Sequence, residues 1–187
     1  MPRWHSILLI VSGGLLAWLL MQAVHELGHV AAAWWTGGKV VQVVLHPLAI
    51  SRTDVDPNPQ PLIVAWSGPL VGSVLPLAIW GLAAALRLRL AWLARWFAGF
   101  CLLANGLYIG VGSFGGIGDA GDMLRSGAPP WTLWLFGTIG ALAGLALWNG
   151  QGEHFGLGSA AQPVDPRVAY GCALALAATA VAEILAS

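Results

Sequence analysis

Five long apolar segments, almost free of charged residues, dominate this 187-residue sequence. A helix needs about 20 apolar residues to cross the hydrocarbon core of a bilayer, and each segment has about that length or more. Charged residues make up 9% of the chain, far below the roughly 25% of soluble domains. The sequence therefore predicts an all-α, multi-pass membrane protein, integral to the bilayer and forming a single domain over residues 1–187. The expected transmembrane helices, about five in number, are Trp4–Trp35, Leu62–Leu86, Leu90–Val111, Trp131–Trp148 and Val168–Leu185.

The stretch between the first two apolar segments has a different composition. Lys39–Leu45 is rich in valine, and Leu48–Thr53 follows the pair His46-Pro47. Two such runs separated by a turn signal predict a short, membrane-associated β-hairpin. Three prolines in Asp54–Pro61 predict an extended linker to the second helix.

Two further stretches are rich in glycine, which disfavours helix. Gly110–Gly118 and Asn149–Gly158 are therefore predicted to be loops.

The pentapeptide His25-Glu26-Leu27-Gly28-His29 lies near the end of the first apolar segment. Two histidines four positions apart share one face of a helix and can bind a single metal ion. With this composition, roughly 0.002 chance occurrences of His-Glu-x-x-His are expected, so the match is a strong signal. Ionisable groups inside a membrane segment are expensive and indicate a functional site. His25 and His29 are therefore predicted zinc ligands, and Glu26 a general base for a metal-activated water.

A catalytic zinc ion takes three protein ligands and leaves one position open. The third histidine of metzincins is absent, because Trp35 occupies that position. The loops after the first and third spans share a membrane face, which favours Asp119 and Asp122 as the third ligand. One of these carboxylates would bind the metal, while the other caps the short helix or orients a histidine. The remaining His, Asp and Glu residues are on the opposite face, near segment ends or on the hairpin and linker: His5, His46, Asp54, Asp56, Glu153, His154, Asp165 and Glu183.

These motifs resemble those of the site-2 protease family of intramembrane zinc metalloproteases (peptidase family M50). His25–His29 followed by Val30-Ala31-Ala32-Ala33 is similar to the family's first motif. Ser67-Gly68-Pro69-Leu70 resembles the Gly-Pro segment that begins its next core helix. Asn105 and the stretch Asp119–Leu124 resemble its second motif, an Asn upstream of Asp-Gly-Gly-x-hydrophobic-Leu. The sequence departs from that motif at Ala120, which replaces a glycine, and at Asp122, which replaces a usually basic residue.

The resemblance implies one Zn²⁺ per chain, bound by His25, His29 and Asp119, with Asp122 as the alternative third ligand. It implies Glu26 as the catalytic base and Asn105 as a contact to the substrate. The implied activity is hydrolysis of peptide bonds in or near transmembrane segments of membrane proteins. An extended substrate would add as a strand to the predicted hairpin.

Two other interpretations remain open at the level of sequence. A non-proteolytic zinc protein could regulate or bind other membrane proteins, but a purely structural site has no need of Glu26. A haem protein would require a second histidine facing His25 or His29 at similar depth. The net charge is zero and the basic residues are scattered, so the sequence gives no indication of a nucleic-acid partner.

Overall fold

Five helices of the protein are long and apolar enough to cross a membrane. They are found in a computed structural model that describes residues 3–158 and 163–186. This result confirms the predicted fold class, including the antiparallel hairpin after the first helix. The membrane-length helices are α1 (Trp4–Trp35), α2 (Pro61–Ala85), α3 (Ala91–Gly115), α5 (Pro130–Trp148) and α6 (Pro166–Ala186).

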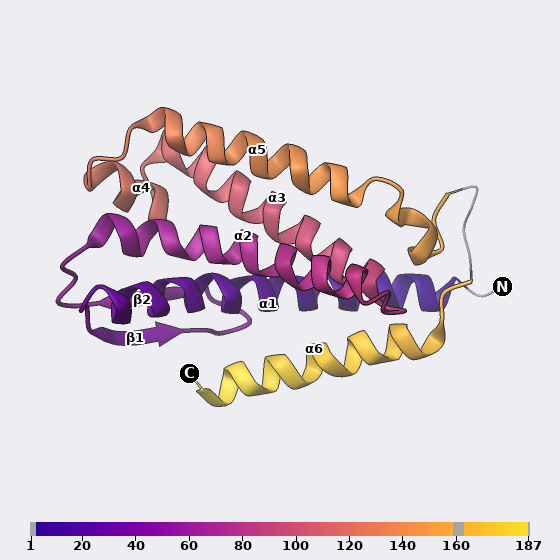
Figure 1. Cartoon of the computed structure of the whole chain (residues 1–187). Coiled ribbons are helices and arrows are strands. Elements are labelled where there is room, and N and C mark those ends of the chain that lie inside the picture. Colours follow the sequence, from indigo (N-terminus) through magenta and orange to yellow (C-terminus); the bar gives the residue numbers. More distant parts are fainter. Residues whose placement is uncertain (1–2, 159–162, 187) are drawn as a thin grey trace.

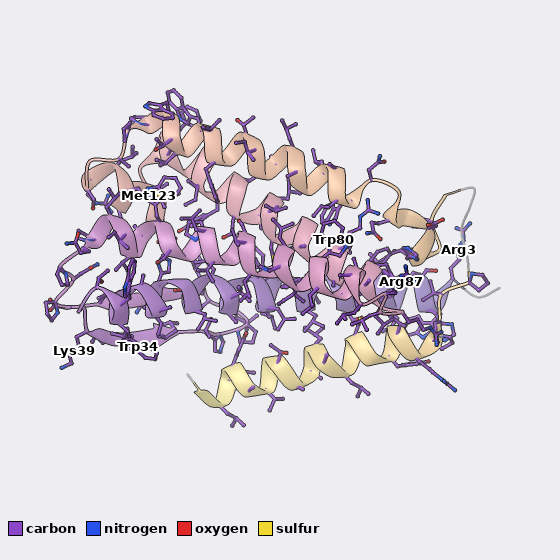
Figure 2. The ribbon with its side chains drawn as sticks, in the orientation of Figure 1. Arg3, Trp34, Lys39, Trp80, Arg87 and Met123 are labelled. Atoms are coloured by element: carbon purple, nitrogen blue, oxygen red, sulfur yellow. The ribbon has the colours of Figure 1, made fainter. Side chains whose placement is uncertain are left out.

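The long helices pack side by side in the order α5, α3, α2, α1, α6 (Figure 1). Large apolar side chains such as Trp18, Val74 and Leu142 are exposed along them, a surface that suits lipid rather than water. Figure 2 shows Arg3 and Arg87 at one end of the bundle and Lys39 at the other. An apolar girdle between two charged ends indicates a membrane protein.

Helices α3 and α5 approach so closely that glycine is required between them. A Cβ on Gly106 would lie 3.1 Å from the carbonyl oxygen of Gly137, and a Cβ on Gly137 would lie 2.7 Å from the Cα of Gly110. Small residues let membrane helices pack backbone against backbone.

This packing explains why the loop predicted for Gly110–Gly118 is wrong. Helix α3 continues to Gly115, because contacts with α5 outweigh the low helix propensity of glycine. The helix stops where the backbone turns left-handed, at Gly116 (φ +59°) and Gly118 (φ +54°). A short helix, α4 (Gly118–Arg125), follows and packs on α2 and α3.

The hairpin consists of β1 (Val40–Val44) and β2 (Arg52–Val55), paired antiparallel. The second strand therefore begins later than the predicted Leu48–Thr53, and it takes two residues from the predicted linker. The cause is a turn after β1: Pro47 has no N–H, and the Ala49 N–H donates to the His46 carbonyl. Residues 46–49 are thereby withdrawn from the ladder.

The predicted loop Asn149–Gly158 also contains regular structure, a 3₁₀-helix η1 (Gln151–Phe155). Its Phe155 side chain is buried in an apolar cluster with Leu9. Burial of the Phe155 ring thus stabilises regular structure in a segment whose glycine content predicts a loop.

Candidate metal centre

Helix α1 presents both histidines of the pentapeptide, together with Glu26, on its buried side. The Nε2 atoms of His25 and His29 lie 3.1 Å apart. The spacing follows from the helix itself, since residues i and i+4 lie one above the other. Sequence reasoning therefore located these two side chains correctly relative to each other.

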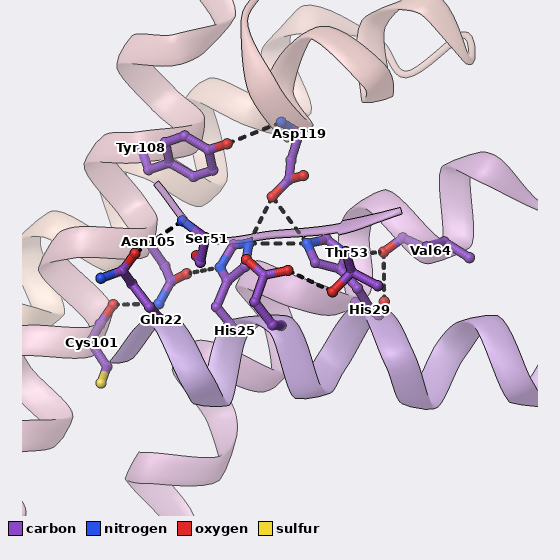
Figure 3. A network of polar contacts seen from close by, with 12 residues as sticks. Gln22, His25, His29, Ser51, Thr53, Val64, Cys101, Asn105, Tyr108 and Asp119 are labelled. Atoms are coloured by element: carbon purple, nitrogen blue, oxygen red, sulfur yellow. Dashed lines mark hydrogen bonds and ion pairs between the residues drawn. The ribbon is translucent and has the colours of Figure 1, made fainter. Parts of the chain in front are cut away.

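Asp119 reaches the histidines from the first turn of α4 (Figure 3). Its Oδ2 lies 2.7 Å from His25 Nε2 and 3.3 Å from His29 Nε2. Asp122, one turn later, is exposed and pairs with Arg125 at 2.6 Å. The structure thus brings Asp119, and not Asp122, to the two imidazole rings.

The outer nitrogens of both rings are held by carbonyl oxygens. His25 Nδ1 donates to the Asn105 side-chain oxygen at 2.7 Å, and His29 Nδ1 donates to the Val64 carbonyl at 2.7 Å. The Asn105 amide is itself oriented, because its Nδ2 donates to the Cys101 carbonyl at 2.9 Å. Carbonyl oxygens only accept hydrogen bonds, so each Nδ1 carries the proton and each Nε2 turns a lone pair toward the site.

Two imidazole lone pairs and one carboxylate therefore converge on one point. The three ligating atoms of His25, His29 and Asp119 all lie within 4.8 Å of one another. Three acceptors at such distances repel one another unless a cation lies between them. The group is a candidate metal-binding site.

The surroundings keep the Asp119 carboxylate ionised. Burial acts to raise the pKa of Asp119, but when the Nε2 atoms of His25 and His29 are also protonated, their hydrogen bonds and positive charge outweigh burial and hold that pKa well below its ordinary range. An ionised carboxylate is the form that binds a metal ion.

The backbone of α2 forms one wall of the centre. A Cβ on Gly68 would collide with His29 Nε2 and lie 2.8 Å from His25 Nε2. A Cβ on Gly28 would lie 2.8 Å from the carbonyl carbon of Ser67. Glycine at both positions lets α1 and α2 pack closely enough to leave the imidazoles room beside the α2 backbone.

The hairpin contacts α1 beside the metal centre through two hydrogen bonds. Thr53 Oγ1 donates to Glu26 Oε2 at 2.7 Å, and the Ser51 N–H donates to the side-chain oxygen of Gln22 at 3.1 Å. A cavity of about 920 Å³ opens here between α1, the hairpin, α3 and α4. It is lined by the metal-site residues and Glu26, and also by Thr53 and Tyr108.

Other residues of interest occupy different places. Asn105, predicted to contact substrate, is buried behind His25, and its role toward substrate stays a prediction. Asp54 is half-buried and pairs with Arg52 at 3.2 Å. Within residues 3–158 and 163–186, none of the remaining candidate ligands joins the group of His25, His29 and Asp119.

Sequence reasoning missed Thr53 and Tyr108 as parts of the site, and it noted Gly68 only within the Gly-Pro segment that resembles the family. The one available signal was the spacing of Tyr108 from Asn105, three residues on α3, which puts both on one helix face. Comparisons with protein-family models, with curated proteins and with solved structures find no match to this chain. Its function is therefore inferred from the geometry of the site and from the resemblance of its motifs.

Proposed function

We propose that this protein is an intramembrane zinc metalloprotease of the site-2 protease type. The proposal rests on one observation: the side chains of His25, His29 and Asp119 converge next to Glu26. The two histidines and Glu26 lie on α1, a helix long enough to cross a membrane. A site of two nitrogens and one oxygen, with a carboxylate neighbour that is not a ligand, is typical of hydrolytic zinc enzymes.

The spacing of the ligating atoms supports zinc as the metal. Ligands around a tetrahedral Zn²⁺ lie roughly 3.3 Å apart, given bond lengths of about 2.0–2.1 Å. The observed separations between the ligating atoms run from 2.7 to 3.3 Å. Nδ1 protonation of both histidines further suits metal binding through Nε2.

The chemistry divides between the metal and Glu26. Zn²⁺ held by His25, His29 and Asp119 would supply an activated water and polarise the scissile carbonyl. Glu26 accepts a proton as water adds to the carbonyl carbon, and it returns that proton to the leaving amide nitrogen. Thr53 holds the Glu26 carboxylate in one orientation through its hydroxyl.

The proposed substrate is a transmembrane segment that becomes extended next to the site. Peptide bonds within a helix are shielded, so local unwinding must precede attack. Among the described residues, the sheet consists of β1 paired with β2, and residues 52–55 of β2 line the cavity. An extended substrate can add to this strand through backbone hydrogen bonds.

The test uses purified protein in liposomes with a panel of single-span membrane proteins. Wild type, Glu26→Gln and the control Glu153→Gln are compared for zinc content and for cleavage products by mass spectrometry. Glu153 lies on η1, outside the metal centre. We expect zinc in all three proteins, and cleavage by wild type and Glu153→Gln alone.

Three results would contradict the proposal. Wild-type protein without zinc would remove its premise. Zinc in wild type with no cleavage of any substrate, or with equal cleavage by Glu26→Gln, would favour a non-proteolytic zinc-binding protein that regulates or binds other membrane proteins.

A further inference from the structure

The Tyr108 hydroxyl lies directly beside the metal centre, on α3 (Figure 3). Its oxygen accepts a hydrogen bond from the backbone N–H of Asp119 at 3.2 Å. The Tyr108 ring packs edge to face with the ring of His25, with their centroids 5.8 Å apart. Two of the three ligands to the metal therefore orient this phenol.

Tyr108 and the two histidines all line the cavity, but Tyr108 is far more exposed than they are. It is 39% exposed, against 7% for His25 and 5% for His29. A substrate would lie in this same cavity. A substrate carbonyl beside the metal can therefore approach the Tyr108 hydroxyl.

The hydroxyl hydrogen of Tyr108 is unused in the part of the chain that the structure describes. The oxygen accepts from Asp119, but none of the described residues accepts a hydrogen bond from it. The Thr53 hydroxyl already donates to Glu26, and one N–H of the Asn105 amide donates to the Cys101 carbonyl. Tyr108 thus offers a donor that nothing around it satisfies.

We propose that Tyr108 is a catalytic residue that stabilises the oxyanion of the tetrahedral intermediate. This inference rests on the proposed function and adds a residue to it. When water adds, a C–O bond forms, the carbonyl π electrons move to the carbonyl oxygen, and Glu26 takes the water proton. When the intermediate collapses, the carbonyl re-forms, the C–N bond breaks, and Glu26 delivers the proton to nitrogen. Tyr108 keeps its proton throughout and donates a hydrogen bond that strengthens as negative charge develops on that oxygen.

The first test compares Tyr108→Phe with Tyr170→Phe, a matched control because the chain has just these two tyrosines. Tyr170 lies on α6, and its ring contacts that of His5. We expect Tyr108→Phe to keep its zinc and to lose about a hundredfold in kcat, with little change in KM. Tyr170→Phe should match wild type in all three measurements.

A second readout does not depend on turnover. A phosphinic peptide built on the identified cleavage sequence carries a tetrahedral, negatively charged group in place of the scissile bond. Calorimetry should show that Tyr108→Phe binds it about tenfold to a hundredfold more weakly than wild type does. The uncleaved substrate peptide should bind equally well to Glu26→Gln and to the double variant Glu26→Gln/Tyr108→Phe.

The possible failures are distinguishable. Cleavage by wild type, with unchanged kcat and phosphinic peptide affinity in Tyr108→Phe, would overturn the role of Tyr108 alone. Loss of zinc from Tyr108→Phe would overturn it as well, because the phenol would then serve to position Asp119. Absence of cleavage by zinc-loaded wild type would instead contradict the proposed function.

Discussion

The Thr53 hydroxyl donates a hydrogen bond of 2.7 Å to the Glu26 carboxylate. This contact joins β2 of the hairpin to the residue that the pentapeptide motif marks as a general base. A hydroxyl donor restricts the orientation of a carboxylate, and the position of a general base decides its efficiency. The hairpin therefore forms part of the candidate site, in addition to lining the cavity next to it.

Replacing Thr53 with valine removes this hydrogen bond and keeps the shape of the side chain. We expect Thr53→Val to retain zinc and to lose about tenfold in kcat, the effect of one hydrogen bond to a charged group. Metal analysis and steady-state kinetics measure the two quantities. Thr138→Val, an exposed change on α5, is the control, and equal kcat in both variants would contradict the positioning role.

Asn105 orients His25, so its loss should weaken metal binding. Asn105→Leu is expected to reduce zinc affinity about 10- to 100-fold, because it removes the acceptor for His25 Nδ1. Asn105→Asp keeps an acceptor oxygen and should retain more of the affinity. Competition with a zinc chelator measures both. An increase in KM with unchanged zinc affinity would instead support the substrate contact predicted from the sequence.

Position 68 requires glycine because the imidazoles of His25 and His29 lie against it, and not because of the conformation of α2. Gly68→Ala should abolish zinc binding, because its Cβ would occupy space against His25 Nε2 and His29 Nε2. Gly81→Ala on the same helix is the control, since a Cβ there meets no atom of a described residue within 4 Å. It should bind zinc normally and unfold at the same or a slightly higher temperature. Normal zinc content in Gly68→Ala would show that α2 lies farther from the ligands than the structure places it.

The two aspartates of α4 should behave differently. Asp119→Ala is expected to lose zinc, since its Oδ2 lies 2.7 Å from His25 Nε2 and 3.3 Å from His29 Nε2. Asp122→Ala should retain it, because that carboxylate pairs with Arg125 on the exposed side of the helix. Zinc content by mass spectrometry decides between them, and the reverse pattern would identify Asp122 as the ligand.

The second strand of the hairpin does not lie where the apolar pattern of the sequence predicts it. Leu48 and Ile50 belong to an apolar run that predicts strand, yet they are 92% and 84% exposed and lie outside the ladder. The ladder instead pairs Val44 with Arg52 and Val40 with Val55. The composition of the strands indicates that a hairpin forms. The register between the two strands depends on the turn and on contacts with α1, and composition does not determine either of these.

The spacing of residues along the sequence was enough to predict the membrane helices and to predict that His25 and His29 share one helix face. Helical periodicity and bilayer thickness are local constraints, and four residues along a helix always return to the same side. The resemblance of Asp119–Leu124 to a family motif already favoured Asp119 over Asp122. The approach of the Asp119 carboxylate to the histidines, the contact of Thr53 with Glu26 and the position of Tyr108 depend instead on how separate elements pack. Those contacts join residues 11 to 94 positions apart, and their geometry follows from close glycine packing at Gly68 and from the packing of α4 on α2 and α3. No local pattern encodes such distances, because they are set by the sum of many side-chain contacts between helices.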